Sequence, residues 1–297
     1  MLTRVVYFPL FVKILYNLIM FGKRRIGIAL CGGAARALSH IGVLQVLEDV
    51  GVEISAVSGC SMGAIIGAIY STGFDLKEVE SLVTSIDWRN FFILSFLSPS
   101  RTGIVNDRKV DEVLKKFLGD KTFADCKKDF CCVAVDILNS KKVVFNSGSL
   151  MEAVRASMAI PGVFPPVYQQ DAMFVDGGIM EPLPTDALKS LNVNFIIASS
   201  IIFERTKSDY TDYDKKAGAK KNSESKKLSI HAILDKSMSI MHTQMVKSYL
   251  PDAQIIIEPK IGDFGFFDFS KGKDIIESGR KAAIEKIPEI KRKLRIR

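Results

Sequence analysis

The chain has 297 residues, of which 47% are hydrophobic and 25% are charged, and its formal net charge is +8. This length and balance predict one large folded domain and exclude a chain that is disordered throughout. Its five cysteines are irregularly spaced, which argues against a disulfide framework and a zinc site and favours a reducing compartment.

Positive charge is concentrated in residues 1–25, 205–227 and 280–297. A nucleic-acid-binding protein usually carries a basic stripe on its folded body, so we expect no nucleic-acid partner. Basic segments outside the folded body favour binding to an anionic membrane surface. The alternative is that these three segments are solvated and keep the protein soluble.

Residues 1–25 form a hydrophobic and basic N-terminal segment. Pro9, Lys13 and Asn17 interrupt its apolar stretch, residues 5–22. Because a membrane-spanning helix needs about 20 apolar residues, we favour a shallow anchor that holds the domain on the cytoplasmic side of a membrane. A true span and a helix packed on the protein's own surface are the alternatives.

From residue 26 onward, short apolar runs alternate with helical patterns, which predicts βαβ units and a parallel sheet in one domain, residues 26–297. A polar, lysine-rich stretch without periodicity predicts a disordered insertion at 205–227. The predicted helices are 37–51 and 62–73, with a third, amphipathic helix after the insertion. The predicted strands are 26–30, 53–59, 130–138, 142–146, 194–202 and 253–259.

The glycine-rich turn at 31–37 (CGGAARA) directly follows the first predicted strand. Backbone N–H groups in such a turn would point inward as an oxyanion hole and stabilise a tetrahedral intermediate. The alternative is a phosphate-binding turn, but neither G-x-G-x-x-G nor the P-loop pattern is present there.

The strongest local signal is Gly59-Cys60-Ser61-Met62-Gly63, between a predicted strand and a predicted helix. In that context G-x-S-x-G forms a nucleophile elbow, whose sharp turn requires small residues on both sides of the serine. The serine would lie at a helix N-terminus, which favours a developing negative charge. Since the pattern also occurs by chance, its flanking elements are what favour Ser61 as a nucleophile.

Asp176-Gly177-Gly178 follows an apolar pair of residues. A carboxylate buried beside a serine would lose hydration, which raises its pKa and its strength as a base. Taken alone, D-G-G is more often an ordinary turn.

Together and in this order, the three groups resemble the patatin-like phospholipase family, whose bacterial members show a G-G-G-x-[RK]-G loop, then G-x-S-x-G, then D-G-[GA]. The stretches at 28–48 (IALCGGAARALSHIGVLQVLE) and 57–70 (VSGCSMGAIIGAIY) are similar to the first two blocks. The aspartate block is matched at 153–167 and 174–184 (FVDGGIMEPLP), and the likeness continues at 266–283, so it covers about residues 26–290.

The resemblance implies a three-layer αβα fold with a central, mostly parallel sheet. It also implies a Ser–Asp dyad without histidine, in which Ser61 is the nucleophile and Asp176 the base. The implied oxyanion donors are the backbone N–H groups of Gly32, Gly33, Ala34 and Met62. The implied substrates are phospholipids, lysophospholipids and acylglycerols, with no metal and no cofactor; a homodimer is left open.

Three residues of the glycine-rich turn at 31–37 affect the geometry of that turn. Arg36 stands at the family's basic position, where it would orient the loop or meet a phosphate. Ala34 and Ala37 stand where the family usually has glycine. If either needs a positive φ, alanine costs about 1–2 kcal/mol, although its N–H donor is kept.

Three other functions compete with this hypothesis. An α/β-hydrolase esterase with a Ser–Asp–His triad is formally open, because His231 and His242 follow Asp176 in the chain. Both lie in the predicted amphipathic helix with no glycine turn to position them, and His40 lies in the first helix. A non-catalytic membrane-binding scaffold and an esterase of soluble acyl esters are the other two.

Two aromatic clusters, residues 88–97 and 265–267, have two interpretations. Each is either ordinary core packing or part of an acyl-chain pocket and the surface around it.

Overall fold

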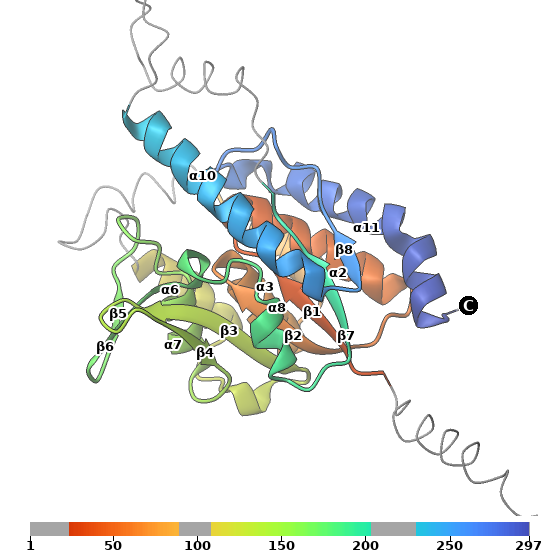
Figure 1. Ribbon diagram of the computed structural model, residues 1–297, viewed down its shortest axis with the longest axis horizontal. Helices are drawn as coiled ribbons and strands as arrows, with labels where there is room; N and C mark the ends of the chain where they lie inside the picture. Colours follow the sequence, from red (N-terminus) through yellow and green to blue (C-terminus); the bar gives the residue numbers. More distant parts are fainter. Residues whose placement is uncertain (1–23, 89–107, 203–229, 297) are drawn as a thin grey trace, which may run out of the picture.

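The computed structural model of the protein describes residues 24–88, 108–202 and 230–296 (Figure 1). The predictions for residues 1–23, for the insertion at 205–227 and for most of the 88–97 cluster therefore lie outside the described residues. Among the helices of the described ranges, none is long and apolar enough to cross a membrane.

One mixed sheet forms the centre of the protein. Its strand order is β5-β6-β3-β2-β1-β7-β8, and β4 pairs with β3 beside this path. The pairs among β8, β7, β1, β2 and β3 are parallel, whereas β4 and β6 run antiparallel to β3. The strands are β1 (Ile26–Leu30), β2 (Ile54–Cys60), β3 (Asp129–Asp136), β4 (Lys141–Phe145), β5 (Val167–Gln169), β6 (Ala172–Asp176), β7 (Phe195–Ser199) and β8 (Ile255–Ile257).

Helices follow most of the parallel strands, as expected for βαβ units. Short 3₁₀ turns η1 (Ala34–Leu38), η3 (Gly177–Ile179), η4 (Leu250–Asp252) and η5 (Phe269–Lys271) lie between the main elements, and η2 (Phe123–Asp125) precedes β3. The helices are α2 (Ser39–Asp49), α3 (Met62–Ser71), α4 (Leu76–Ser85), α6 (Arg108–Phe117), α7 (Leu150–Ser157), α8 (Thr185–Lys189), α10 (Ile230–Tyr249) and α11 (Gly272–Leu294).

Side chains of the central strands alternate between two cores, because successive residues of a strand point to opposite faces of the sheet. Ile28 and Leu30 of β1 belong to the larger core with α2, α3 and α11, whereas Ala29 belongs to a second core with α8 and α10. Figure 1 shows α10 and α8 on one face of the sheet and α2 and α11 on the other. The predicted three-layer α/β fold with a mostly parallel sheet is confirmed.

The end of β2 and the end of β6 meet on β3. Cys60, the last residue of β2, pairs with Val133 of β3, and the next β3 residue, Ala134, pairs with Asp176, the last residue of β6. Both β3 residues also pair with β4, so β2 and β6 share the opposite edge of β3. Because β6 runs antiparallel to β3, its C-terminal end points at the C-terminal end of β2. The residue after Cys60 is Ser61.

Candidate active site

Ser61 lies at a sharp turn between β2 and α3. Its backbone has φ 54° and ψ −125°, a strained conformation for a residue with a side chain. The turn is so tight that a Cβ on Gly59 would lie 2.5 Å from the carbonyl oxygen of Gly63, and a Cβ on Gly63 would lie 2.4 Å from that of Leu30. The local geometry is therefore that of a nucleophile elbow.

A hydrogen bond from another element supports this strained residue. The Ser61 N–H donates to the hydroxyl oxygen of Ser157, the last residue of α7, over 3.0 Å. Ser157 is fully buried, and it lies in the block that resembles the family's aspartate region. No sequence pattern singled out Ser157, because its partner is 96 positions away in the chain.

Asp176 is buried at the end of β6 beside this elbow. Its Oδ1 accepts the Gly178 N–H at 2.7 Å, and the Cys60 thiol lies 3.8 Å away. Burial raises the pKa of the Asp176 carboxyl to about 6, and the nearby Ser61 side chain, the Gly178 backbone N–H and the Cys60 thiol lower that pKa only in part. Oδ2 has no hydrogen-bond partner among the residues that the structure describes.

The glycine-rich turn lies against Ser61, since a Cβ on Gly32 would be 3.3 Å from the Ser61 Cβ. The Gly32 N–H donates to the carbonyl oxygen of Pro182 at 2.9 Å, so it is not directed at an oxyanion, which differs from the sequence prediction. Within the described part of the chain, no hydrogen bond engages the N–H of Gly33 or Ala34. These two groups and the Met62 N–H in the first turn of α3 are the donors that the arrangement offers.

Ala34 has the positive φ that makes alanine costly. Its φ is 48°, whereas the φ of Ala37 lies outside the left-handed region. Of the two alanines that replace a family glycine, only Ala34 therefore adopts a strained backbone conformation.

Arg36 connects the turn to the segment before α11. The Arg36 Nε–H donates to the carbonyl oxygen of Phe264 at 2.6 Å, and the Ala35 N–H donates to that of Phe266 at 3.1 Å. The Arg36 side chain is buried, so its contacts serve to orient the loop.

His40 is buried behind the turn. Its Nε2 lies 2.8 Å from the Cys31 carbonyl oxygen, which can only accept, so Nε2 donates there and Nδ1 accepts from the Ser199 hydroxyl at 2.7 Å. Burial lowers the pKa of His40 to about 4. This neutral imidazole links β1 to β7 and does not contact Asp176.

His242 of α10 also lies against the turn. Burial lowers its pKa to about 4, a hydrogen bond with the Gly32 backbone raises it in part, and the charge of Arg36 lowers it. The side chain of His231 lies outside the described residues. No described histidine is among the causes of the Asp176 pKa shift.

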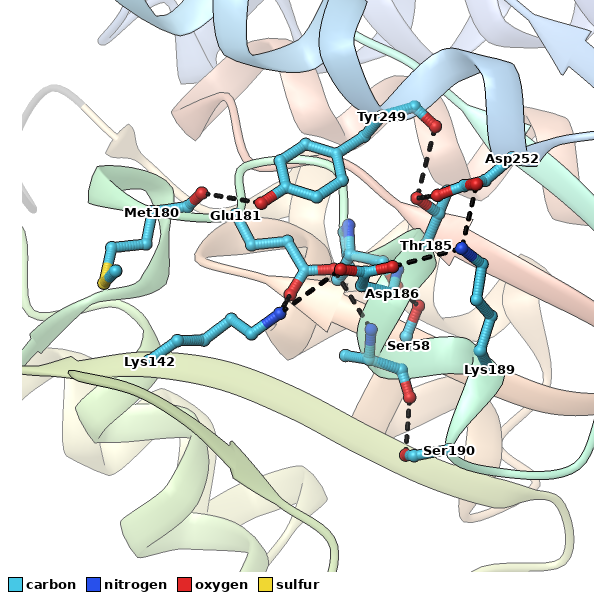
Figure 2. Close-up of polar contacts among 12 residues, drawn as sticks. Ser58, Lys142, Met180, Glu181, Thr185, Asp186, Lys189, Ser190, Tyr249 and Asp252 are labelled. Carbon is cyan, nitrogen blue, oxygen red and sulfur yellow. Dashed lines mark hydrogen bonds and ion pairs between the residues drawn. The ribbon is translucent and has the colours of Figure 1, made fainter.

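A buried carboxylate holds the segment that follows Asp176 (Figure 2). Glu181 is fully buried, and its Oε1 accepts the N–H groups of Asp186 and Ala187 at 2.9 and 3.0 Å, at the start of α8. Its Oε2 forms an ion pair of 2.7 Å with Lys142 of β4. Sequence patterns did not indicate Glu181, because its partners come from two other elements.

The same segment is tied to α10 and to the glycine-rich turn. The Tyr249 hydroxyl donates to the Met180 carbonyl oxygen at 3.0 Å (Figure 2). The Pro182 carbonyl oxygen accepts the Gly32 N–H. The position of Asp176 is thereby coupled to the position of the turn.

An apolar pocket opens beside Ser61. It encloses about 900 Å³, including the part open to solvent. In the described part of the chain, Ser61 is its one lining residue with a hydroxyl or a charge. The lining residues are Ala34, Leu38, Ser61, Met62, Ile65, Ile69, Val83, Ile86, Trp88, Val110, Val113, Leu114, Phe117, Met158, Ile160, Phe164, Phe266, Phe267 and Phe269.

The fold and this site define a class of protein. An α/β sheet that carries a serine at a nucleophile elbow, beside a buried carboxylate and a turn whose N–H groups at Gly33 and Ala34 have no hydrogen-bond partner among the described residues, has the parts of a serine acyl hydrolase. A family model described as patatin-like phospholipase matches residues 28–189. The chain therefore belongs to the patatin-like phospholipase family, as the sequence motifs predicted.

Individual relatives agree with this assignment. An uncharacterized NTE family protein of Mycobacterium tuberculosis is 35% identical over 60% of this chain and 49% of its own length. A lysophospholipase of Yarrowia lipolytica is 27% identical over 90% of this chain but only 20% of its own length. The chain thus spans about half, or less, of these curated relatives. The crystal structure of VipD from Legionella pneumophila has the same fold, with a TM-score of 0.53, 13% identity and coverage of 90% of this chain and 67% of that one.

Proposed function

We infer that the protein is a serine hydrolase that cleaves acyl ester bonds of phospholipids or lysophospholipids, with Ser61 as nucleophile and Asp176 as base. The observation that carries this proposal is the approach of β2 and β6 on β3, which brings a strained serine next to a buried carboxylate. The Ser61 side chain lies near enough to lower the pKa of Asp176, and Asp176 Oδ2 has no hydrogen-bond partner among the described residues, which supports direct proton transfer between the two side chains.

The proposed reaction has two acyl-transfer steps. Asp176 takes the proton of Ser61 as the hydroxyl oxygen attacks the ester carbonyl, and the N–H groups of Gly33, Ala34 and Met62 stabilise the oxyanion. The lysolipid or alcohol then leaves with a proton returned by Asp176. Water, deprotonated by the same carboxylate, hydrolyses the acyl-enzyme and regenerates the Ser61 hydroxyl.

A lipid substrate is supported by the pocket and by the relatives. The lining around Ser61 is apolar, which suits an acyl chain and not a charged ligand. The family description and the name of the Yarrowia lipolytica relative both indicate phospholipid chemistry. In this proposal the partner surface is an anionic membrane, which residues 1–25 bind.

A triad that includes histidine receives less support. The His242 ring lies against the Gly32 backbone and Arg36, and the polar atoms of His40 are engaged by Ser199 and Cys31. Neither contact gives an imidazole placed between Ser61 and Asp176.

Labelling with a fluorophosphonate tests the proposal. The wild type should be labelled, Ser61→Ala should not be labelled, and Asp176→Asn should be labelled at least about a hundredfold more slowly, because general-base catalysis typically contributes that much. His231→Ala and His242→Ala should keep most of the wild-type rate. Loss of labelling in a folded histidine variant would favour a triad, and an unlabelled wild type would favour a non-catalytic scaffold.

A further inference from the structure

The pocket beside Ser61 follows the axis of α3. Met62, Ile65 and Ile69 line it, and their spacing of three and four residues places them on one face of this helix. Ile69 lies two helical turns beyond Ser61, which corresponds to about 12 Å along the axis at 1.5 Å per residue. The pocket is therefore a channel that extends from the proposed nucleophile along α3.

Helix α6 forms a second wall of the pocket. Val110, Val113, Leu114 and Phe117 all line the pocket, and their spacing again places them on a single helical face. The wall residues are apolar throughout, so an acyl chain would meet hydrocarbon on both sides.

Two contacts show that α6 runs in the same direction as α3. Near the start of α6, Asp111 pairs at 2.8 Å with Arg155, which lies two residues before the Ser157 that holds the Ser61 backbone. At the end of α6, the ring of Phe117 packs edge-on against Phe74, with centroids 5.5 Å apart.

Phe74 follows the last turn of α3, which ends at Ser71. Phe117 and Ile69 both line the pocket near the C-terminal ends of their helices, and Ile69 is the pocket residue of α3 that is farthest along the helix from Ser61. Both side chains are buried, at 6% and 3% exposed, and we call this end of the pocket its floor.

We propose that Ile69 and Phe117 set the longest acyl chain that the enzyme accepts, and that the channel holds one acyl chain at a time. The inference rests on the proposed function, because it needs Ser61 to attack an ester at the mouth. Each methylene buried along the channel should raise kcat/KM about fourfold, the ratio that corresponds to about 0.8 kcal/mol. Once the chain reaches the floor, further methylenes should gain nothing or lower the rate.

A series of p-nitrophenyl esters from butyryl to stearoyl, at fixed detergent concentration, measures this length. Ile69→Ala and Phe117→Ala should move the optimum to longer chains, and Ile69→Phe should move it to shorter ones. We expect the ratio of kcat/KM for a longer and a shorter ester to change at least about tenfold, the range typical of methylene-sized changes in a pocket. The ratio within one preparation does not depend on how much of the protein is folded.

Ile66→Ala is the matched control. Ile66 has the same side chain, lies on the same helix and is as buried as Ile69, at 3% exposed, but it does not line the pocket. Its variant should lose similar stability and keep the wild-type chain-length profile.

The outcomes separate the two claims. An active wild type whose profile is unchanged by Ile69→Ala and Phe117→Ala, or is shifted equally by Ile66→Ala, overturns the assignment of the floor. Absence of both hydrolysis and fluorophosphonate labelling at every chain length overturns the proposed function itself.

Discussion

At the scale of single residues, burial determines the chemistry available to Asp176. An exposed aspartate ionises near pH 4 and is a weak base, whereas loss of hydration holds the pKa of Asp176 at about 6. A carboxylate with a pKa closer to neutrality accepts a proton more readily and is still ionised at pH 7. This property depends on the tertiary structure, since D-G-G alone does not predict burial.

The pH dependence of kcat/KM follows from this pKa. Asp176 acts as a base only when it is ionised, so the rate should be constant above about pH 7 and fall tenfold per unit below about pH 6. A pH profile with a soluble ester measures it. A decline centred near pH 4 would instead point to an ordinary carboxylate or to His40 or His242, whose pKa values lie there.

Replacing Asp176 should also change stability, with a sign that depends on pH. Because the folded-state pKa lies above the unfolded value of about 3.9, burial of the charge destabilises the protein at neutral pH by up to ~3 kcal/mol, and this penalty decreases as pH falls below about 6 and is lost below about 4. Asp176→Asn should therefore be much less active but more stable than the wild type at pH 8, with a smaller difference in stability at pH 5.

Asp136, on β3, is the control for this effect. Its carboxylate accepts hydrogen bonds from Asn139 and from backbone N–H groups, and these lower its pKa. Asp136→Asn should therefore reduce stability at pH 8. Denaturant titrations of both variants at the two pH values measure the difference, and the same sign for both would contradict the burial argument.

At the scale of elements, β3 brings the two halves of the site together. Its first residues pair with β2 and its last residues pair with β6 on the same edge. The strands at 26–30 and 142–146 were predicted almost to the residue, but the β5–β6 hairpin was not predicted. Its strands are only three and five residues long, too short for a clear alternating pattern.

The Glu181–Lys142 pair should contribute stability to this arrangement. Glu181→Gln leaves Lys142 partly buried without its nearest partner, which we expect to cost about 1–3 kcal/mol. This estimate is below that for a fully buried pair, because Lys142 is 29% exposed and Asp186 lies 3.8 Å from it. Chemical unfolding with and without the substitution tests it.

A surface carboxylate provides the comparison for that measurement. Glu285 lies 3.9 Å from Lys260, and both side chains are largely exposed. Glu285→Gln should therefore change stability by less than about 1 kcal/mol. An equally small effect of Glu181→Gln would show that the buried pair does not stabilise the fold.

At the scale of the whole molecule, α11 closes the larger core by packing closely on α2. A Cβ on Gly279 would lie 1.9 Å from the Ser39 carbonyl oxygen, so Gly279→Ala must push the two helices apart. We expect a loss of about 1–3 kcal/mol or more, as for other overpacked contacts, measured by thermal or denaturant unfolding.

Gly272→Ala, at the start of α11, is the matched substitution. Its added Cβ would meet the Leu38 side chain at 3.4 Å, an ordinary contact distance. Because alanine also favours the helical conformation, this variant should be neutral or slightly stabilising. A similar loss of stability in both variants would contradict the close-packing explanation for Gly279.

The sequence by itself determined the family, the α/β class and the central strands, because buried parallel strands and a nucleophile elbow impose local patterns of apolar and small residues. The sequence motifs also singled out Ser61 and Asp176 as candidate site residues, but they did not establish that the two residues are neighbours in the fold. Only the tertiary structure decided that β2 and β6 meet on β3, that the Gly32 N–H is taken by Pro182, and that Ser157 and Glu181 support the site. These contacts join residues far apart in the chain, and local sequence patterns carry no information about which distant groups will become neighbours.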